Sequence, residues 1–435
     1  MRNQINNLES YWLLNCHVPE SLLPKGNWQP NKKGLCLVNI EIEAGSIKTV
    51  TVDEAVESSD GFDLAKKIVL PCFVDVHTHL DKGHIWQRSP NKDGTFQTAL
   101  ETARSDYRHW QREDLYRRME FNLKCAYAHG TKAIRTHLDS FGEQVKISFE
   151  VLRDLQQQWQ DKLEIQAVSL VSLDYYQTEA GIALADLVKQ YGGILGGVAY
   201  IQPEIDSQID TLFKLAKERD LDLDLHVDEN DDPDSTCLAK IAEAAIRHDF
   251  QGKIVCGHCC SLAVQSPDTA SKTIKLVKEA GITVVSLPMC NLYLQDRYYR
   301  EDKPITPTWR GVTRVHELQQ QGISVAMASD NTRDPFYGFG DLDMLEVFQQ
   351  SVRIAHLDSD YNYWINSVTT TPAGVMAEKA TVEPGETADL VVFSGRYYSE
   401  LLSRSQHDRI VIRQGKAIDT TLPAYCELDD LVGLK

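Results

Sequence analysis

The sequence has no hydrophobic run long enough to cross a membrane. No stretch of its 435 residues approaches ~20 consecutive apolar residues, the length that a transmembrane helix needs. The N-terminal segment, MRNQINNLESYWLLNCHVPESLL, also lacks the apolar core of a signal peptide. These absences predict a cytoplasmic protein with no membrane partner.

Cysteine is present, but not in the spacing of a disulfide framework. The 10 cysteines are scattered along the chain. One C-x-x-C occurs, from Cys256 to Cys259, and no second pair completes a zinc site with four cysteine ligands. We therefore predict reduced thiols, as in a cytoplasmic protein.

Basic residues are fewer than acidic residues. Lys and Arg total 45 against 63 Asp and Glu, which gives a formal net charge of -18, and there is no long Lys/Arg run. A chain of this charge repels a phosphate backbone, so we exclude nucleic acid as a partner. A small neutral or cationic substrate is compatible with the charge, and so is a homo-oligomer.

The most informative motif that is present is Asp75-Val76-His77-Thr78-His79, directly after the apolar run 68–74. Side chains two residues apart on a strand point to the same face. His77 and His79 are therefore expected side by side at the end of a buried strand. Paired neutral imidazoles of this kind bind transition metals.

Apolar strands alternate with helical stretches through the middle of the chain. The predicted strands are 70–79, 133–138, 163–173, 197–201, 223–227, 253–257, 283–287 and 324–328. Eight strands separated by helices are typical of an α/β fold of the (β/α)8 TIM-barrel type.

The sequence pattern differs at both ends of the chain, where it predicts short strands separated by turns. We therefore predict a barrel over residues 71–375. Residues 1–70 and 376–435 are predicted to form a small, discontinuous β-sandwich domain.

Three more predicted strands end in polar residues, in the segments LDLDLHVDE (221–229), IVCGH (254–258) and ISVAMASDN (323–331). In such barrels the carboxyl ends of the strands carry function. His77, His79, His226 and Asp330 are therefore predicted to bind one divalent metal, with a position left open for water. Nitrogen and oxygen donors suit Zn2+ and Fe2+, so both metals are candidates.

Glu229, His258 and Asp330 are the predicted catalytic residues. A bound metal lowers the pKa of its water towards about 7, and Asp330 is expected to accept the water's proton. Glu229 is expected to pass a proton to the substrate, and His258 to stabilise developing charge. The alternatives are a solvated acidic loop around Glu229, a core histidine at 226, a lone histidine after an apolar strand at 258 and a helix N-cap at Asp330.

Several motifs together resemble the amidohydrolase superfamily, specifically its cytosine deaminase-like branch. They include PCFVDVHTHLDKG (71–83), DLHVDENDD (224–232), NLYLQDR (291–297) and SDNTRDPFYGFG (329–340). The resemblance runs over nearly the whole chain and implies the same metal ligands, with Glu229 as proton shuttle and His258 near the attacking hydroxide. It also implies hydrolytic deamination, in which a ring C–NH2 group leaves as ammonia. No lysine ends the fourth strand, where binuclear relatives place a bridging lysine, which favours one metal.

The sequence departs from that branch at two positions. Ser172 is nearest to the place of a glutamine that reads the amide edge of a pyrimidine, and Asn331 replaces the second acid of an Asp-Asp pair. A polar edge of the substrate that finds no hydrogen-bond partner in the site lowers the enzyme's selectivity between substrates. The predicted substrate-binding residues are Ser172, Asn331, Lys82 and Phe336.

The predicted function is metal-dependent deamination of a small amino-substituted N-heterocycle, with cytosine or a close analogue as the main prediction. The alternatives are a larger aminoheterocycle, namely isoguanine, a pterin or an aminotriazine, and a cyclic amide hydrolase. A third interpretation is a catalytically silent barrel, against which the presence of all six metal and catalytic residues argues.

Overall fold

The computed structural model describes residues 1–52, 61–301 and 303–433. The chain folds into two compact units. The first consists of Met1–Asp75, Lys124–Ala133 and Asp343–Pro423. The second consists of Val76–Leu123, Ile134–Leu342 and Ala424–Lys435.

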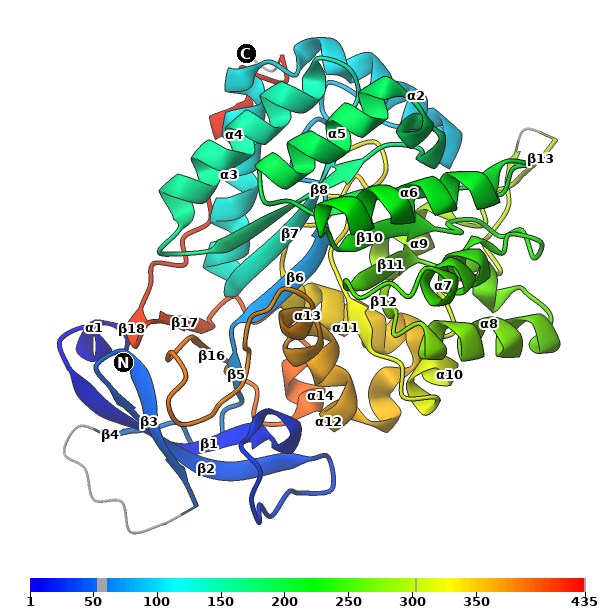
Figure 1. The fold of residues 1–435 in the computed structure, drawn as a ribbon. Coiled ribbons are helices and arrows are strands. Elements are labelled where there is room, and N and C mark those ends of the chain that lie inside the picture. Colours follow the sequence, from blue (N-terminus) through cyan, green and yellow to red (C-terminus); the bar gives the residue numbers. More distant parts are fainter. Residues whose placement is uncertain (53–60, 302, 434–435) are drawn as a thin grey trace. The chain divides into compact units, whose positions relative to one another are not determined.

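The second unit is built around a ring of strands (Figure 1). A three-stranded sheet contains β6 (Phe73–Thr78), β7 (Thr131–Asp139) and β8 (Glu164–Leu170). A five-stranded sheet contains β9 (Leu195–Ala199), β10 (Leu223–Val227), β11 (Ile254–His258), β12 (Thr283–Ser286) and β15 (Val325–Met327). Parallel bridges between Ser172 and Val198 and between Thr78 and Asp330 join the two sheets at both edges. The strands therefore close into a barrel.

This arrangement confirms the predicted α/β fold with parallel strands, although some strand ends differ from the prediction. The predicted strand 197–201 is β9, which begins two residues earlier. The prediction took Gly196 and Gly197 as a boundary. Glycine is needed inside this strand instead, because a Cβ on Gly196 would overlap Val168 and the backbone of Asp224.

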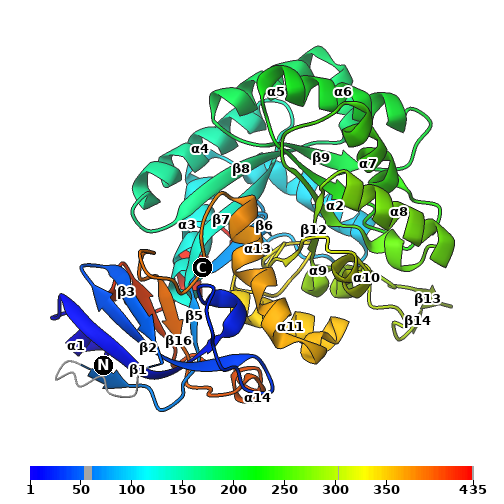
Figure 2. The same cartoon turned by 60° about the horizontal axis from the view of Figure 1, so that its bottom comes forward.

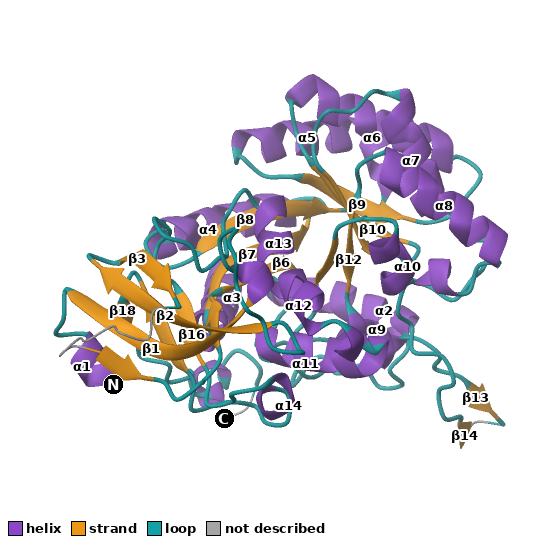
Figure 3. Ribbon diagram, turned by 90° about the horizontal axis from the view of Figure 1, so that it is seen from below, coloured by secondary structure: helices purple, strands orange, loops and turns teal. Residues whose placement is uncertain are grey.

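Helices cover the outside of the barrel. Figures 2 and 3 show α4 to α8 following one another around the strands. They are α4 (Gln144–Trp159), α5 (Glu179–Gln190), α6 (Ile205–Arg219), α7 (Cys237–Arg247) and α8 (Pro267–Glu279). Helix α7 shows why these helices pack on the barrel. It is amphipathic, and one of its faces buries Leu238, Ile241, Ala242 and Ala245. The other helices that begin in this unit are α2 (Phe96–Asp106), α3 (Arg112–His129), α9 (Pro288–Leu294) and α10 (Val315–Gln320).

The first unit contains two four-stranded sheets. The first has the order β3-β2-β1-β4 and contains β1 (Ser10–Pro19), β2 (Leu35–Glu43), β3 (Ser46–Thr51) and β4 (Gly61–Asp63). The second has the order β18-β17-β16-β5 and contains β5 (Val69–Pro71), β16 (Leu390–Val392), β17 (Ile410–Arg413) and β18 (Lys416–Ala417). Strands from both terminal regions therefore pair within one unit.

The first unit also carries helices. They are α1 (Arg2–Ile5), α11 (Met344–Ala355), α12 (Tyr361–Trp364), α13 (Thr370–Val375) and α14 (Tyr398–Leu401). Asp343–Pro423 thus groups with the β sheets and Ala424–Lys435 with the second unit, whereas the prediction placed 343–375 in the barrel and 376–435 in the terminal domain. Within the predicted terminal domain, 53–60 and 434–435 lie outside the described residues.

A short hairpin of β13 (Tyr299–Arg300) and β14 (Lys303–Pro304) follows α9. Across the ranges that the structure describes, no helix combines the length and the apolar character that crossing a bilayer requires.

Candidate active site

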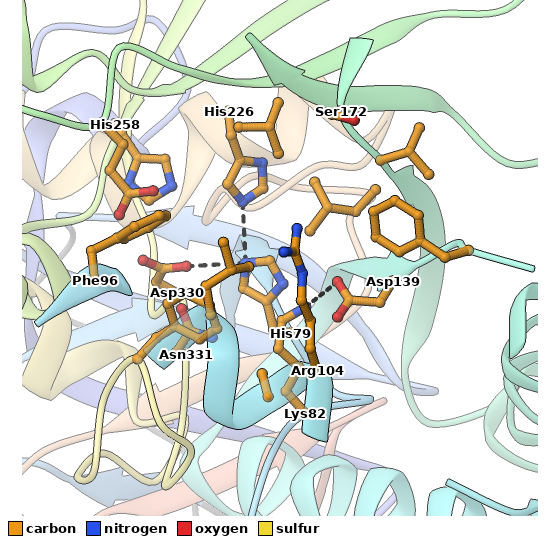
Figure 4. A pocket seen from close by; sticks show the side chains of 18 of the residues that line it. His79, Lys82, Phe96, Arg104, Asp139, Ser172, His226, His258, Asp330 and Asn331 are labelled. Carbon is orange, nitrogen blue, oxygen red and sulfur yellow. Dashed lines mark hydrogen bonds and ion pairs between the residues drawn. The ribbon is translucent and has the colours of Figure 1, made fainter. Parts of the chain in front are cut away.

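Four donor groups converge where barrel strands end. His77 lies in β6, His79 just after it, His226 in β10, and Asp330 follows β15. The Nε2 atom of His226 is 3.2 Å from Nε2 of both His77 and His79. Oδ1 of Asp330 is 3.3 Å from Nε2 of His79 and 3.7 Å from Nε2 of His77. Figure 4 shows His79, His226 and Asp330 pointing toward one another.

These separations fit one bound metal ion. Metal–nitrogen bonds of about 2.0–2.1 Å place the ligand atoms of a tetrahedron roughly 3.3–3.4 Å apart. The three Nε2 atoms cannot all be satisfied by hydrogen bonds to one another, because a neutral imidazole has a single N–H. Burial, reinforced by neighbouring rings and, for His79 and His226, by Lys82, lowers the pKa of all three histidines well below its ordinary value. Neutral imidazoles are the form that binds a metal.

The backbone is unusual at two of these strand ends. Asp330 has φ 66° and His258 has φ 68°, in the left-handed region that residues other than glycine rarely adopt. Such a conformation costs on the order of 1–3 kcal/mol and is typical of functional sites. The amide of Asp330 donates to the carbonyl of His77 at 2.9 Å, which holds the end of the last barrel strand against the first.

Glu229 and His258 form a second pair beside the donors. Oε1 of Glu229 lies 3.2 Å from Nδ1 of His258. Burial and the charge of Asp330 raise the pKa of Glu229 well above its ordinary value, which favours the protonated carboxyl. Burial lowers the pKa of His258 to about 3, so its ring is neutral. The acidic-loop alternative for Glu229 is wrong, because this side chain faces the buried site.

Asn291 orients this pair, and the sequence analysis assigned it no role. Its Nδ2 lies 3.0 Å from Nδ1 of His258 and donates to Oε1 of Glu229 at 3.3 Å. When Asn291 donates to Nδ1, the proton of a neutral His258 lies on Nε2. The motif that begins at Asn291 was the available signal, but the contact depends on helix α9 following β12.

Lys82 belongs to a buried polar network. It is 3% exposed and makes an ion pair with Asp139, to which Tyr107 also donates a hydrogen bond. The amide of Asp139 donates in turn to Oδ2 of Asp81 at 2.7 Å. Burial alone lowers the pKa of Lys82, but the carboxylates of Asp139 and Asp81 raise it above its ordinary value. Lys82 is therefore a fixed ammonium donor at the cavity wall.

A cavity of about 780 Å³ joins these groups. All the predicted site residues except His77 line it, including Ser172, Asn331 and Phe336. Its apolar wall consists of Phe96, Leu100, Ala103, Phe141, Leu170, Val171, Val198 and Phe336. The residues of α2 were not predicted, because that helix lies between the first barrel strand and α3 and not at a strand end.

The predicted substrate-binding residues differ in how they are held. Nδ2 of Asn331 donates to Oδ2 of Asp334 at 2.7 Å, so this amide is fixed. Ser172 ends the segment after β8 and pairs with Val198 by a parallel bridge. Phe336 packs edge to face against Phe96, with ring centroids 5.6 Å apart. The cavity thus has aromatic walls and a few oriented polar groups, which is typical of sites for small molecules.

Comparison with known proteins identifies the family of this chain. Residues 124–418 match the model of the Amidohydrolase family. The pterin deaminase of Rhizobium rhizogenes is 47% identical over 432 residues, covering 98% of this chain and 98% of that protein. The N-isopropylammelide isopropyl amidohydrolase of a Pseudomonas species is 23% identical over 389 residues, covering 85% of this chain and 91% of that protein.

The fold is similar to that of 5-methylcytosine deaminase from Klebsiella pneumoniae, with a TM-score of 0.80. That likeness covers 95% of this chain and 98% of the other at 23% identity. These findings confirm the predictions of a metal-dependent family and of a hydrolase that acts on C–N bonds. The chain belongs to the amidohydrolase family.

Proposed function

We propose that this chain deaminates a pterin, replacing the exocyclic amino group of the ring with oxygen and releasing ammonia. The observation that carries the proposal is a buried Glu229 that lies beside Asp330 of the His/Asp cluster, in the wall of the same cavity. The 47% identity to a pterin deaminase over 98% of the chain supports a bicyclic substrate. The pterin alternative of the sequence analysis is therefore better supported than its main prediction, cytosine.

His77, His79, His226 and Asp330 are the residues that would hold one divalent cation, Zn2+ or Fe2+. When bound, the cation supplies a Lewis acid that lowers the pKa of a water molecule towards about 7. Asp330 lies beside Glu229 and accepts a proton from the attacking water. The cation-binding cluster and the proton carrier are thus neighbours, as hydrolysis of a C–NH2 group requires.

Glu229 acts on the substrate side. Its carboxyl donates a proton to the ring nitrogen next to the C–NH2 carbon, which makes that carbon more electrophilic. It then takes up the hydroxyl proton of the attacked carbon, while the proton held by Asp330 passes to the amino group, so that water and the C–NH2 group become a ring carbonyl and ammonia. Its burial supports this role, because a carboxyl with a raised pKa is an effective acid near neutral pH.

His258 and Lys82 donate hydrogen bonds to oxygen atoms of the substrate. A neutral His258 with its proton on Nε2 donates to the oxygen that develops on the attacked carbon. Lys82 donates to the ring carbonyl next to the amidine. It thereby takes the role of the glutamine that the cytosine deaminase-like branch has near the position of Ser172. Phe96 and Phe336 pack against the flat ring, while Ser172 and Asn331 line its edges.

The test is ammonia release by protein reconstituted with Zn2+ or Fe2+, offered pterin, cytosine, isoguanine and an aminotriazine. We expect release from pterin and a much smaller rate with cytosine. Release from cytosine alone would overturn the pterin assignment and keep the reaction class. Metal-loaded protein that releases ammonia from none of the four would overturn deamination of this substrate class.

We also propose, from the sequence, that the protein is cytoplasmic, that it can form a homo-oligomer, and that its terminal sheets form a β-sandwich. The domain bounds 71–375, 1–70 and 376–435 stay predictions. Size-exclusion chromatography with light scattering would measure the oligomeric state.

A further inference from the structure

Helix α2 presents one face to the cavity. The side chain of Thr95 accepts a hydrogen bond from the amide of Thr98 and so begins the helix at Phe96. Residues four apart then lie on one face of a helix. Accordingly Phe96, Leu100 and Arg104 all line the cavity. The first two are apolar, and the third is a cation in the last turn.

Arg104 differs from the other cation of the cavity, Lys82. Lys82 is ion-paired with Asp139. Arg104 makes no hydrogen bond or ion pair with any residue in the described part of the chain, and its side chain is exposed to the cavity. Figure 4 shows it extending into the pocket. Its positive charge opposes the rise in the pKa of the Tyr107 and Tyr200 hydroxyls, so the guanidinium lies near these two residues, which also line the cavity.

The charges of the cavity wall leave Arg104 without a counterion. Asp139 is matched by Lys82, and Asp330 belongs to the metal-binding cluster. Oε1 of Glu229 lies against Nδ1 of His258 and accepts a hydrogen bond from Asn291. In a chain of net charge -18, an unmatched guanidinium at the wall of the active-site cavity is unexpected unless it meets a negative group of a ligand. Arginine binds carboxylates with two parallel hydrogen bonds.

We propose that Arg104 is a specificity residue that binds a carboxylate carried by the substrate on the side of the ring remote from the amino group. This inference rests on the proposed function. For a pterin, the carboxylate is a substituent of the pyrazine ring. Lys82 and Glu229 then hold the reacting pyrimidine half, the aromatic wall holds the flat surface, and Arg104 selects for the charge at the far end.

The test compares two substrates that share one ring, pterin and a pterin with a carboxylate on the pyrazine ring. The enzymes are the metal-loaded wild type, Arg104→Gln, Arg104→Lys and the control Arg108→Gln. Arg108 is an exposed neighbour that hydrogen-bonds to His109 and does not line the cavity. We expect Arg104→Gln to lower the preference for the carboxylated substrate, measured as a ratio of kcat/KM values, by about 10- to 100-fold through KM. Arg104→Lys retains part of the preference, and Arg108→Gln retains all of it.

Two results would overturn the inference. Equal losses of kcat/KM for both substrates would mean that Arg104 contacts the ring or supports the fold, and unchanged kcat/KM for both would mean that it contacts neither substrate. Raised salt gives a second readout, because it weakens the wild type's preference and leaves that of Arg104→Gln nearly constant.

Failure of the proposed function is seen separately, as the absence of ammonia release from both pterins by the wild type. The same ratio is then measured on whichever heterocycle the enzyme does deaminate, with and without a carboxylate. The role of Arg104 is thus tested separately from the identity of the heterocycle.

Discussion

Oε1 of Glu229 lies 3.2 Å from Nδ1 of His258, although the two residues come from different strand ends of the barrel. Both side chains line the cavity that holds the His/Asp cluster. Burial raises the pKa of the Glu229 carboxyl and lowers that of the His258 imidazole, so it disfavours the charged form of both groups. This pairing is the feature on which the proposed chemistry depends.

Replacing the proton carrier should abolish turnover but not metal binding. We expect Glu229→Gln to lower kcat by about 10²- to 10⁴-fold, because the amide keeps the shape of the carboxyl but transfers no proton. Metal content per chain, measured by elemental analysis, should equal that of the wild type. Asp234→Asn, an exposed acid of the same loop, is the control and should keep full activity. Near-normal turnover of Glu229→Gln would remove Glu229 from the mechanism.

Asn291 should act by positioning the pair. We expect Asn291→Ala to lower kcat by about tenfold with little change in KM, because His258 and Glu229 lose a shared donor that costs about 1–1.5 kcal/mol to remove. Leu292→Ala alters an exposed residue of the same helix and tests whether α9 itself tolerates substitution. An effect on KM alone would assign Asn291 to substrate binding instead.

Removal of the metal should abolish activity reversibly. Chelation is expected to lower the rate by more than about 10³-fold, and added Zn2+ or Fe2+ should restore it. His226→Ala should bind less metal than the wild type at every concentration tested, because one of three converging nitrogens is lost. Circular dichroism controls for folding. Full activity of the metal-free protein would exclude a metal-dependent mechanism.

Position 172 should tune the choice of ring. We expect Ser172→Gln to lower kcat/KM for pterin by about tenfold or more, because the longer side chain enters the space next to Val171 and Val198. Ser172→Ala removes only a hydroxyl and should change kcat/KM by less than about threefold. Comparing cytosine and pterin on both variants measures the effect. Unchanged pterin kinetics in Ser172→Gln would place the substrate away from this edge.

A buried ion pair should stabilise the first unit. Nη1 and Nη2 of Arg409 donate to Oδ1 and Oδ2 of Asp343 at 2.7 and 2.6 Å. Burial alone raises the pKa of Asp343, but Arg409 and His129 hold it below its ordinary value. Asp343→Asn should lower the free energy of unfolding by about 3–5 kcal/mol, because it leaves the guanidinium buried without its counterion.

The pH dependence of that loss follows from the lowered pKa. A carboxyl with a depressed pKa in the folded protein contributes its full stability above the unfolded pKa, near 3.9, and loses it only as the pH falls through the folded value. The difference between wild type and Asp343→Asn in urea unfolding should therefore be constant from about pH 5 to 8. Asp358→Asn, an exposed acid of the same unit, is the control. A difference that changes within this range would contradict the assignment.

The sequence by itself determined the barrel and its metal-binding cluster. Residues two apart on a strand share a face, and parallel barrel strands bring their carboxyl ends together, so His77, His79, His226 and Asp330 could be placed at one site from local pattern alone. Glu229 and His258 followed from the same rule. The family resemblance rests on these residues as well.

The tertiary structure decided what surrounds that cluster. Lys82 forms an ion pair with Asp139, Asn291 donates a hydrogen bond to Glu229, and α2 places Arg104 at the cavity. Each of these contacts depends on packing between segments that are distant in the sequence, and the local sequence of neither segment predicts the contact. Periodicity indicates which face of an element is buried, but not which distant side chain lies against it. The reaction class could therefore be predicted from the strand ends, whereas the size, aromatic walls and charge of the substrate site depend on long-range packing.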